Sequence, residues 1–292
     1  MTAPARSTFR FVHRLRVRWA EVDMQKIVFN AHYLMYLDTA MAAYWRTLAL
    51  PYEDAMKALG GDIYLRHVEV DFQASARLDD MLDIALRCER IGMTSMQFQG
   101  QIRRDDATLI SARLTYVFAD PTTQRPCAVP QPLRELMLSY EAGEAPADVL
   151  CGSWDTLGAE AAALRRAVFI TEQGIDAPLD TDEQDAAAVH AVVRNRLGQA
   201  IATARLLSSD LGTGSLQRVA VRREVRGTQW GRLAVQALID LATEQGVRQL
   251  RVCAQASAIP FWLRLGFVPE GALFQEAGRP HQHLCMQLVD QA

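Results

Sequence analysis

The hydrophobic pattern of the first 140 residues alternates, turns helical, and then alternates again. From residue 14 to residue 19, apolar side chains alternate with arginines, which predicts a strand. From residue 31 to about residue 50 the chain is apolar and aromatic on nearly every side, which predicts a buried helix. Asn30 is the expected N-cap, because its side chain can accept hydrogen bonds from the first turn, and Pro51 is expected to end the helix.

Four further segments alternate in the manner of strands and are separated by glycine or by clusters of charged residues. They cover residues 63–72, 82–88, 96–102 and 110–116. A strand, a long helix and then four antiparallel strands predict one sheet wrapped round one helix, which is an α+β arrangement. A short leucine-rich helix to about residue 140 is expected to close this half.

A second pattern of helices and strands begins at about residue 155, after a small, acidic and aperiodic stretch. One amphipathic helix in this half is expected to bury Leu233, Ala237, Leu238 and Leu241. The remaining elements are a helix at residues 157–168, strands at 191–193, 201–207, 216–221 and 250–256, and a short helix followed by two strands.

Length and composition agree with two domains. The chain has 292 residues, of which half are apolar and 22% are charged, so it can bury a sizeable core. The aperiodic acidic stretch is the natural linker. We therefore predict a first domain over residues 1–140, a linker over residues 141–150 and a second domain over residues 151–292.

Charge and cysteine usage exclude several classes of protein. The net charge is −3 and the isoelectric point is near 6.1, so no basic field suggests nucleic-acid binding. The N-terminus lacks the apolar core of a signal peptide, and no apolar run approaches membrane-spanning length. Five scattered cysteines without a Cys-x-x-Cys pair suit a reducing compartment, so we expect a soluble cytoplasmic protein.

The loop between the first strand and the long helix carries candidate chemistry. Asp23 lies in this loop, which holds a carboxylate near the N-terminus of a buried helix. Unpaired N–H groups and the helix dipole favour developing negative charge at that point. Taken alone, a loop carboxylate that only favours the start of a helix is the simpler interpretation.

The segment from Arg18 to Thr39, together with the strands that follow it, resembles the hot-dog acyl-CoA thioesterases of the 4-hydroxybenzoyl-CoA type, including the Tol-Pal-associated subgroup. The resemblance covers residues 9–140 and favours catalysis over the simpler interpretation. It implies that Asp23 attacks the thioester carbon or activates a water, and that the backbone N–H of Asn30 stabilises the oxyanion. One subgroup carries histidine where this chain has Asn30. The resemblance also implies a homo-oligomer, a dimer or tetramer, with the site near a subunit boundary.

The second half resembles the GNAT N-acyltransferases. The run from Val168 to Gln173, with Asp182, Asp185 and His190 after it, is similar to the N-terminal region of one GNAT subgroup. A loop and a helix N-terminus after the strand at 216–221 match the segment that cradles the CoA pyrophosphate in this family. The residues implied to bind acetyl-CoA or acyl-CoA are Val219, Val221, Arg226, Gly227, Thr228, Gln229, Trp230 and Gly231.

Two positions depart from the GNAT pattern. Gln229 stands at the usual central glycine, and its side chain is tolerable only if φ at this position is not positive. Trp262 stands where many members have a tyrosine that protonates the leaving thiolate, and indole does not titrate near neutral pH. Glu172, Asp182, Asp185 and Glu224 are the candidates for an acid or base.

His281 and His283 share a strand face, but no third ligand stands at a metal-binding spacing, so we predict no metal. We predict instead a fusion of a hot-dog thioesterase with a GNAT-type mixed α/β domain. CoA thioesters are its substrates, with no permanently bound cofactor, and an unknown amine is the acceptor. The first alternative is an active thioesterase whose GNAT-like domain is a regulatory CoA-binding module. The second is a non-catalytic scaffold, which the retained Asp23 disfavours.

Overall fold

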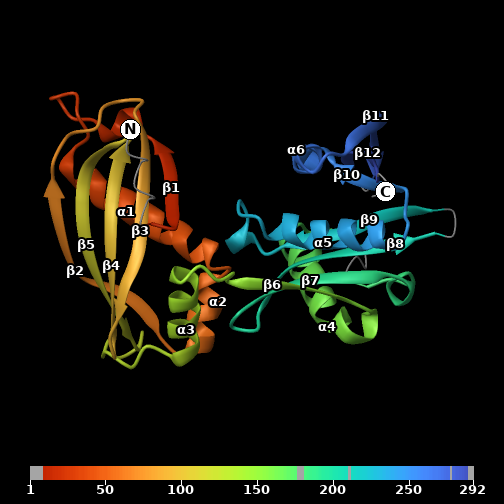
Figure 1. The fold of residues 1–292 in the computed structure, drawn as a ribbon, viewed down its shortest axis with the longest axis horizontal. Helices are drawn as coiled ribbons and strands as arrows, with labels where there is room; N and C mark the ends of the chain where they lie inside the picture. Colours follow the sequence, from red (N-terminus) through yellow and green to blue (C-terminus); the bar gives the residue numbers. More distant parts are fainter. Residues whose placement is uncertain (1–8, 176–180, 210–211, 277, 289–292) are drawn as a thin grey trace, which may run out of the picture. The chain divides into compact units, whose positions relative to one another are not determined.

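The computed structural model describes residues 9–175, 181–209, 212–276 and 278–288. The chain divides into two compact units, Met1–Pro146 and Ala147–Ala292, and each is described by itself (Figure 1). None of the described helices combines the length and apolar character that a bilayer crossing needs.

The first unit is a five-stranded antiparallel sheet that curves round one helix, as predicted (Figure 1). The strand order is β1-β3-β4-β5-β2. The strands are β1 (Phe11–Arg16), β2 (Asp62–Phe72), β3 (Met81–Ile91), β4 (Ser95–Arg104) and β5 (Ala107–Ala119). The helices are α1 (Asn30–Thr47), α2 (Tyr52–Leu59), which the sequence analysis missed, and α3 (Gln131–Glu141).

Helix α1 packs one face against the sheet, and at Gly100 the two come so close that an added Cβ would lie 2.9 Å from Leu37 Cδ2. The buried face has the spacing of an amphipathic helix, and its residues are Tyr33, Tyr36, Leu37, Ala40, Met41, Tyr44 and Trp45. The opposite face is exposed, with Leu34 42% and Met35 54% accessible. The prediction of a helix buried on nearly all sides is therefore wrong within one chain.

Two boundaries near Asp23 also differ from the prediction. Strand β1 ends at Arg16, and Trp19 belongs to a short 3-10 helix (Trp19–Glu21) with its side chain 78% exposed. Asn30 is the first residue of α1, and Phe29 occupies the N-cap position. Phenylalanine has no side-chain acceptor, so the first N–H groups of α1 receive no side-chain cap.

The second unit is a seven-stranded sheet in the order β11-β12-β10-β9-β8-β7-β6, and among its described strands only β9 and β10 pair in parallel. The main helices are α4 (Trp154–Arg165) and α5 (Trp230–Glu244), which Figure 1 shows on opposite faces of the sheet. A π-helix (Arg166–Glu172) continues α4, and α6 (Ile259–Arg264) is short. The strands are β6 (Ala147–Gly152), β7 (Val189–Asn195), β8 (Ala200–Ser208), β9 (Thr213–Val221), β10 (Gln249–Gln255), β11 (Val268–Glu276) and β12 (Arg279–Gln287).

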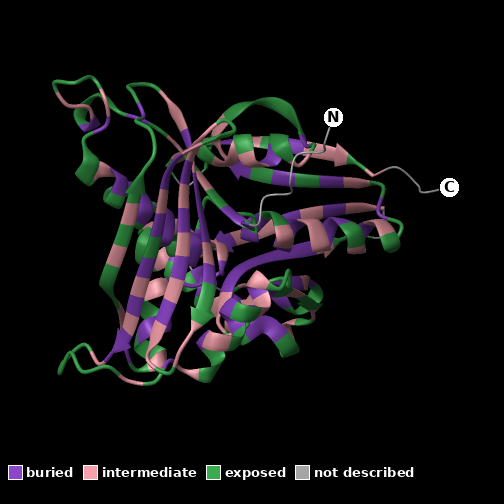
Figure 2. Ribbon diagram, turned by 60° about the vertical axis from the view of Figure 1, so that its left-hand side comes forward, coloured by how far each residue is buried: buried purple, intermediate pink, exposed green. Residues whose placement is uncertain are grey.

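Figure 2 shows how burial follows these elements, with buried positions recurring along the strands of both units. Strand β6 begins at Ala147, inside the stretch that the sequence analysis assigned to the linker. The buried face of α5 is rotated from the predicted one. Of the predicted residues only Leu238 is buried, and it is accompanied by Ala234, Val235, Ile239 and Ala242.

Candidate functional sites in the two domains

Asp23 lies in a tight turn that immediately precedes α1. Its backbone N–H donates to the carbonyl of Ile27 at 3.0 Å, and its own carbonyl accepts from the N–H of Lys26 at 2.9 Å. Lys26 adopts a positive φ of 62°, a conformation that reverses the chain within this turn. The carboxylate of Asp23 accepts the N–H of Gln25 at 2.8 Å, which fixes one of its oxygens.

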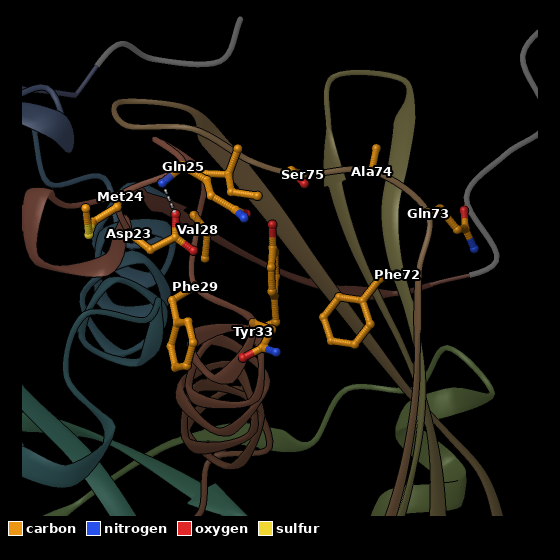
Figure 3. Close-up of a pocket in the computed structure, with 12 residues that line it drawn as sticks. Asp23, Met24, Gln25, Val28, Phe29, Tyr33, Phe72, Gln73, Ala74 and Ser75 are labelled. Atoms are coloured by element: carbon orange, nitrogen blue, oxygen red, sulfur yellow. Dashed lines mark hydrogen bonds between the residues drawn. The ribbon is translucent and has the colours of Figure 1, made fainter.

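Asp23 and Asn30 line the same cavity, whose volume is about 670 Å³. Figure 3 shows Asp23 and Phe29 on one side and Phe72 on the other. Because α1 begins at Asn30, the backbone N–H of Asn30 belongs to the turn that has no intrahelical acceptor. One carboxylate and one helix N-terminus therefore converge on one cavity, although the Asn30 side chain does not cap the helix as predicted.

Glu21, which the sequence analysis did not single out, links the segment before Asp23 to α1 through buried hydrogen bonds. Its side chain is only 3% exposed and accepts the backbone N–H of Arg18 at 2.7 Å and the hydroxyl of Tyr36 at 2.7 Å. The Arg18 guanidinium donates to the other carboxylate oxygen, with Nε at 2.6 Å. Burial alone would raise the pKa of Glu21, but these donors outweigh it and hold the pKa below its ordinary value.

In the second unit, the parallel strands β9 and β10 separate soon after they meet. They pair at three positions only, the last being Arg251 with Ser215. Beyond that point β9 also carries a bulge, because the two residues between Gln217 and Ala220 oppose a single residue of β8, and Arg218 has a positive φ of 52°. The C-terminal part of β9, which contains Val219 and Val221, is therefore not paired with β10, and its backbone edge borders the split between the two strands.

The loop after β9 has the form that an anion cradle needs. Gly227 has a φ of 79°, which favours glycine, whereas Gln229 has a φ of −99° and serves as the N-cap residue of α5. The side chain of Gln229 is thus accommodated without strain, as the sequence analysis required. At Gly231 an added Cβ would lie 2.9 Å from Val221 Cγ2, so this glycine permits the close approach of α5 to β9.

The adjacent residues Glu172 and Gln173 hydrogen-bond to arginines on the two sides of the split, one in the loop after β9 and one at the start of β12. The guanidinium of Arg226 donates to both oxygens of Glu172 at 2.6 and 2.7 Å and to the carbonyl of Val221 at 2.9 Å. On the other side, Arg279 donates to the carbonyl of Gln173 at 2.9 Å. The Glu-Gln pair of the GNAT-like motif therefore spans the split between β9 and the β10–β12 pair.

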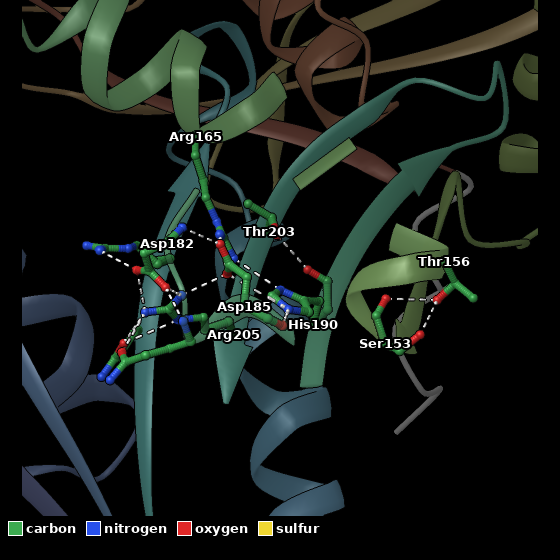
Figure 4. A network of polar contacts seen from close by, with 12 residues as sticks. Ser153, Thr156, Arg165, Asp182, Asp185, His190, Thr203 and Arg205 are labelled. Carbon is green, nitrogen blue, oxygen red and sulfur yellow. Dashed lines mark hydrogen bonds and ion pairs between the residues drawn. The ribbon is translucent and has the colours of Figure 1, made fainter. Parts of the chain in front are cut away.

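A buried network of charged side chains holds the segment before β7 (Figure 4). Asp185 is 2% exposed and accepts from Arg165 and Arg205, each at 2.7 Å. Asp182 accepts from Arg205 and, at 2.7 Å, from Arg218. The Arg205 guanidinium holds the pKa of Asp182 well below its usual range. Both aspartates are committed to structural ion pairs, which argues against the acid or base role considered from the sequence.

Trp262 packs as a core residue. It is 5% exposed, and its ring meets Phe261 and Phe267 edge to face at 5.2 and 5.1 Å. His281 and His283 both lie against the ring of Phe274. Among the residues that the structure describes, no three His, Cys, Asp or Glu side chains are grouped to hold a metal ion.

Family comparisons follow this division of the chain. The sequence profile of the thioesterase superfamily matches residues 25–111, and that of the acetyltransferase (GNAT) family matches residues 160–267. The chain is a fusion of a thioesterase-superfamily domain with a GNAT-family domain. The predicted resemblances and fold classes, hot-dog and GNAT, are confirmed. Asn30 lies inside the thioesterase match, and Asp23 lies two residues before it.

Known proteins resemble each domain separately. The acyl-CoA thioester hydrolase YbgC of Escherichia coli is 29% identical over 126 residues, which are 43% of this chain and 93% of YbgC. A candidate N-acetyltransferase from Lactobacillus plantarum has 28% identity and a TM-score of 0.46, covering 49% of this chain and 99% of its own. A 1,4-dihydroxy-2-naphthoyl-CoA thioesterase from Synechocystis has 18% identity and a TM-score of 0.41, covering 44% of this chain and 95% of its own.

Proposed function

We propose that the thioesterase domain hydrolyses an acyl-CoA thioester to a carboxylic acid and free CoA. The observation that carries this proposal is the shared cavity of Asp23 and Asn30. Asp23 either takes a proton from an attacking water, or itself attacks the thioester carbon, so that the C–S bond breaks, CoA leaves as its thiolate, and water then cleaves the mixed anhydride. The charge that develops on the carbonyl oxygen is stabilised by the N–H of Asn30 at the helix N-terminus. The likeness to YbgC, an acyl-CoA thioester hydrolase, supports the same reaction.

The test is the release of CoA thiol from short, long and aromatic acyl-CoAs without any amine acceptor. We expect Asp23→Asn to abolish release, and Asp38→Asn, an exposed residue of α1 away from the cavity, to leave it unchanged. Release that survives in Asp23→Asn would refute the assignment of Asp23. The ranking of the panel would name the preferred acyl class.

For the GNAT domain we propose binding of an acyl-CoA, with the pyrophosphate on the loop from Arg226 to Gly231 and at the N-terminus of α5. Backbone N–H groups and the helix dipole suit a diphosphate there. Transfer of the acyl group to an amine is the activity that the family suggests. Trp262 is buried and Asp182 and Asp185 are ion-paired, so these observations favour the alternative of a regulatory CoA-binding module.

Calorimetry with CoA separates the two sites in the full chain. We expect two CoA sites per chain in the wild type and one in Gly231→Ala, because the new methyl group would press on Val221. A single site in both proteins would remove the GNAT domain from the proposal.

We also propose that the chain forms a homo-oligomer through the thioesterase domain. Strand β2 is an eleven-residue edge strand with most of its side chains exposed, and unpaired edges of this length favour pairing with another strand. Large apolar side chains are exposed on β2, on α1 and at the N-cap of α1, namely Leu65, Phe72, Leu34, Met35 and Phe29. A cytoplasmic location stays part of this proposal, on the cysteine pattern alone.

A further inference from the structure

Tyr33 is a buried polar side chain of the cavity to which the proposed reaction assigns no role. It lies on α1 three residues after Asn30, so the two share a helix face. Side chains of a helix lean toward its N-terminus, which directs the ring of Tyr33 toward the Asp23 turn. The side chain is 2% exposed and lines the same cavity as Asp23 and Asn30. Figure 3 shows it standing between the Asp23 turn and Phe72.

The hydroxyl of Tyr33 has an unused proton. A phenol can both accept and donate a hydrogen bond. The oxygen of Tyr33 accepts the backbone N–H of Ala76 at 2.9 Å, and in the described part of the chain the hydroxyl has no acceptor for its own proton. Burial raises the pKa of Tyr33, so the proton stays in place at neutral pH.

The other tyrosines of α1 make the contrast plain. Tyr36 donates its hydroxyl to Glu21 at 2.7 Å, and Tyr44 donates to Glu141 at 2.8 Å. Both donors are used within the protein, and neither residue lines the cavity. A buried donor without a partner destabilises the folded state, so a donor left open in a cavity fits a ligand that supplies the acceptor.

The ring of Tyr33 is also held in place. It meets Phe72 edge to face at 5.8 Å and Tyr36 at 6.0 Å, and the Ala76 bond fixes its far end. A donor that is already oriented needs no reorganisation when charge develops nearby, which is the condition for electrostatic stabilisation of a transition state.

We propose that Tyr33 donates a hydrogen bond to an oxygen atom of the bound acyl thioester. This inference rests on the proposed hydrolysis and adds a second donor to the N–H of Asn30. The acceptor is either the thioester carbonyl oxygen or an oxygen substituent on the acyl group. Both are oxygen atoms of the same ligand: negative charge develops on the carbonyl oxygen during the reaction, whereas the acyl substituent stays uncharged. Kinetic measurements distinguish the two.

The experiment compares Tyr33→Phe with Tyr44→Phe in the full chain. Each variant loses one hydroxyl and one internal hydrogen bond on the buried face of the same helix, but only Tyr33 lines the cavity. Substrates are matched acyl-CoA pairs with and without an oxygen on the acyl group, such as 3-hydroxybutyryl-CoA and butyryl-CoA. Thermal unfolding by circular dichroism checks that both variants fold.

We expect Tyr44→Phe to stay within about twofold of the wild type. If the acceptor is the carbonyl oxygen, Tyr33→Phe lowers kcat about 100-fold for every substrate while KM changes little. If the acceptor is an acyl oxygen, kcat/KM falls about tenfold or more only for the oxygen-bearing member of each pair.

Two results overturn the inference while leaving the hydrolysis intact. The first is a Tyr33→Phe enzyme within about twofold of the wild type on every pair. The second is an equal loss in Tyr44→Phe, which would trace the effect to helix packing. A wild type that releases no thiol, or that releases it independently of Asp23, refutes the proposed function and this inference together.

Discussion

Replacing Glu21 by glutamine tests whether a buried carboxylate holds the Asp23 turn. The change preserves the size of the side chain and removes its charge. One carboxylate oxygen accepts from the Arg18 N–H and from Tyr36, and the other faces the Arg18 guanidinium. Glutamine has a single acceptor oxygen, so its NH2 group must face donors on one side.

The least costly orientation turns the NH2 group toward the Arg18 guanidinium, because that side chain is 74% exposed and can move into water. The amide oxygen then keeps the Tyr36 and Arg18 N–H bonds, but as an uncharged acceptor. A hydrogen bond to a charged group contributes about 1 kcal/mol more to folding stability than a hydrogen bond between neutral groups. We therefore expect the thioesterase domain to lose about 1–2 kcal/mol, which corresponds to a fall in Tm of several degrees.

The pH dependence carries a definite sign. The folded-state pKa of Glu21 lies below its ordinary value of 4.5, so its stabilising contribution is complete above that value. The contribution is lost as the pH falls through the lowered folded pKa. The gap in unfolding free energy between the wild type and Glu21→Gln should therefore be constant from pH 6 to pH 8 and close at acidic pH.

Calorimetric unfolding over this pH range, with CoA release measured in parallel, provides the assay. Glu53→Gln, which changes an exposed carboxylate on α2, is the matched control. We expect activity to fall with stability in Glu21→Gln, because the Asp23 turn loses an anchor. Equal stability of Glu21→Gln and wild type at pH 7, or a gap that persists unchanged at acidic pH, would refute the reasoning.

Four further variants test other parts of the chain. Gly231→Ala should weaken CoA binding by the GNAT domain at least tenfold in calorimetry, because its methyl group enters a 2.9 Å contact. Asp185→Asn should destabilise the GNAT domain by about 3–5 kcal/mol in urea unfolding, since it removes a buried charge that both Arg165 and Arg205 contact, whereas Asp155→Asn on the exposed start of α4 should change little. Met35→Glu should convert the proposed oligomer to a monomer in light scattering, because a charge replaces an exposed apolar side chain of α1. Trp262→Tyr should give no acyl transfer to any amine, because position 262 lies in the core; a gain would favour an active transferase.

Most strands of both domains were predictable because strand alternation is a local property of the sequence, whereas β6 was assigned in part to the linker. The start of α1 was not predictable. Asn30 is a better N-cap than Phe29 by propensity, yet the Asp23 turn and its bridge from Val22 to Val28 set where the helix begins. A bridge between two residues of a loop depends on the folded backbone, so the hydrophobic pattern of the sequence does not reveal it.

The charged side chains show the same limit more strongly. Glu21 is buried because Tyr36, fifteen positions later, turns its hydroxyl onto the carboxylate. Asp185 is buried because Arg165 and Arg205, each twenty positions away, converge on it. Composition assigns such residues to the surface, and only the fold reveals that their charges are neutralised internally.

The two proposed sites would bind different parts of the same CoA thioester for different purposes. The loop before α5 would hold the pyrophosphate, which free CoA and acyl-CoA share, so binding there cannot by itself tell substrate from hydrolysis product. Discrimination would have to come from the split between β9 and β10, beside the bulge of β9 that contains Arg218 and Val219. An acyl carbonyl can accept a backbone N–H there, whereas a free thiol offers only a weak acceptor. A regulatory GNAT domain that reports acyl-CoA must therefore bind it more tightly than CoA, and equal affinities for the two would leave the domain unable to follow the reaction of its neighbour.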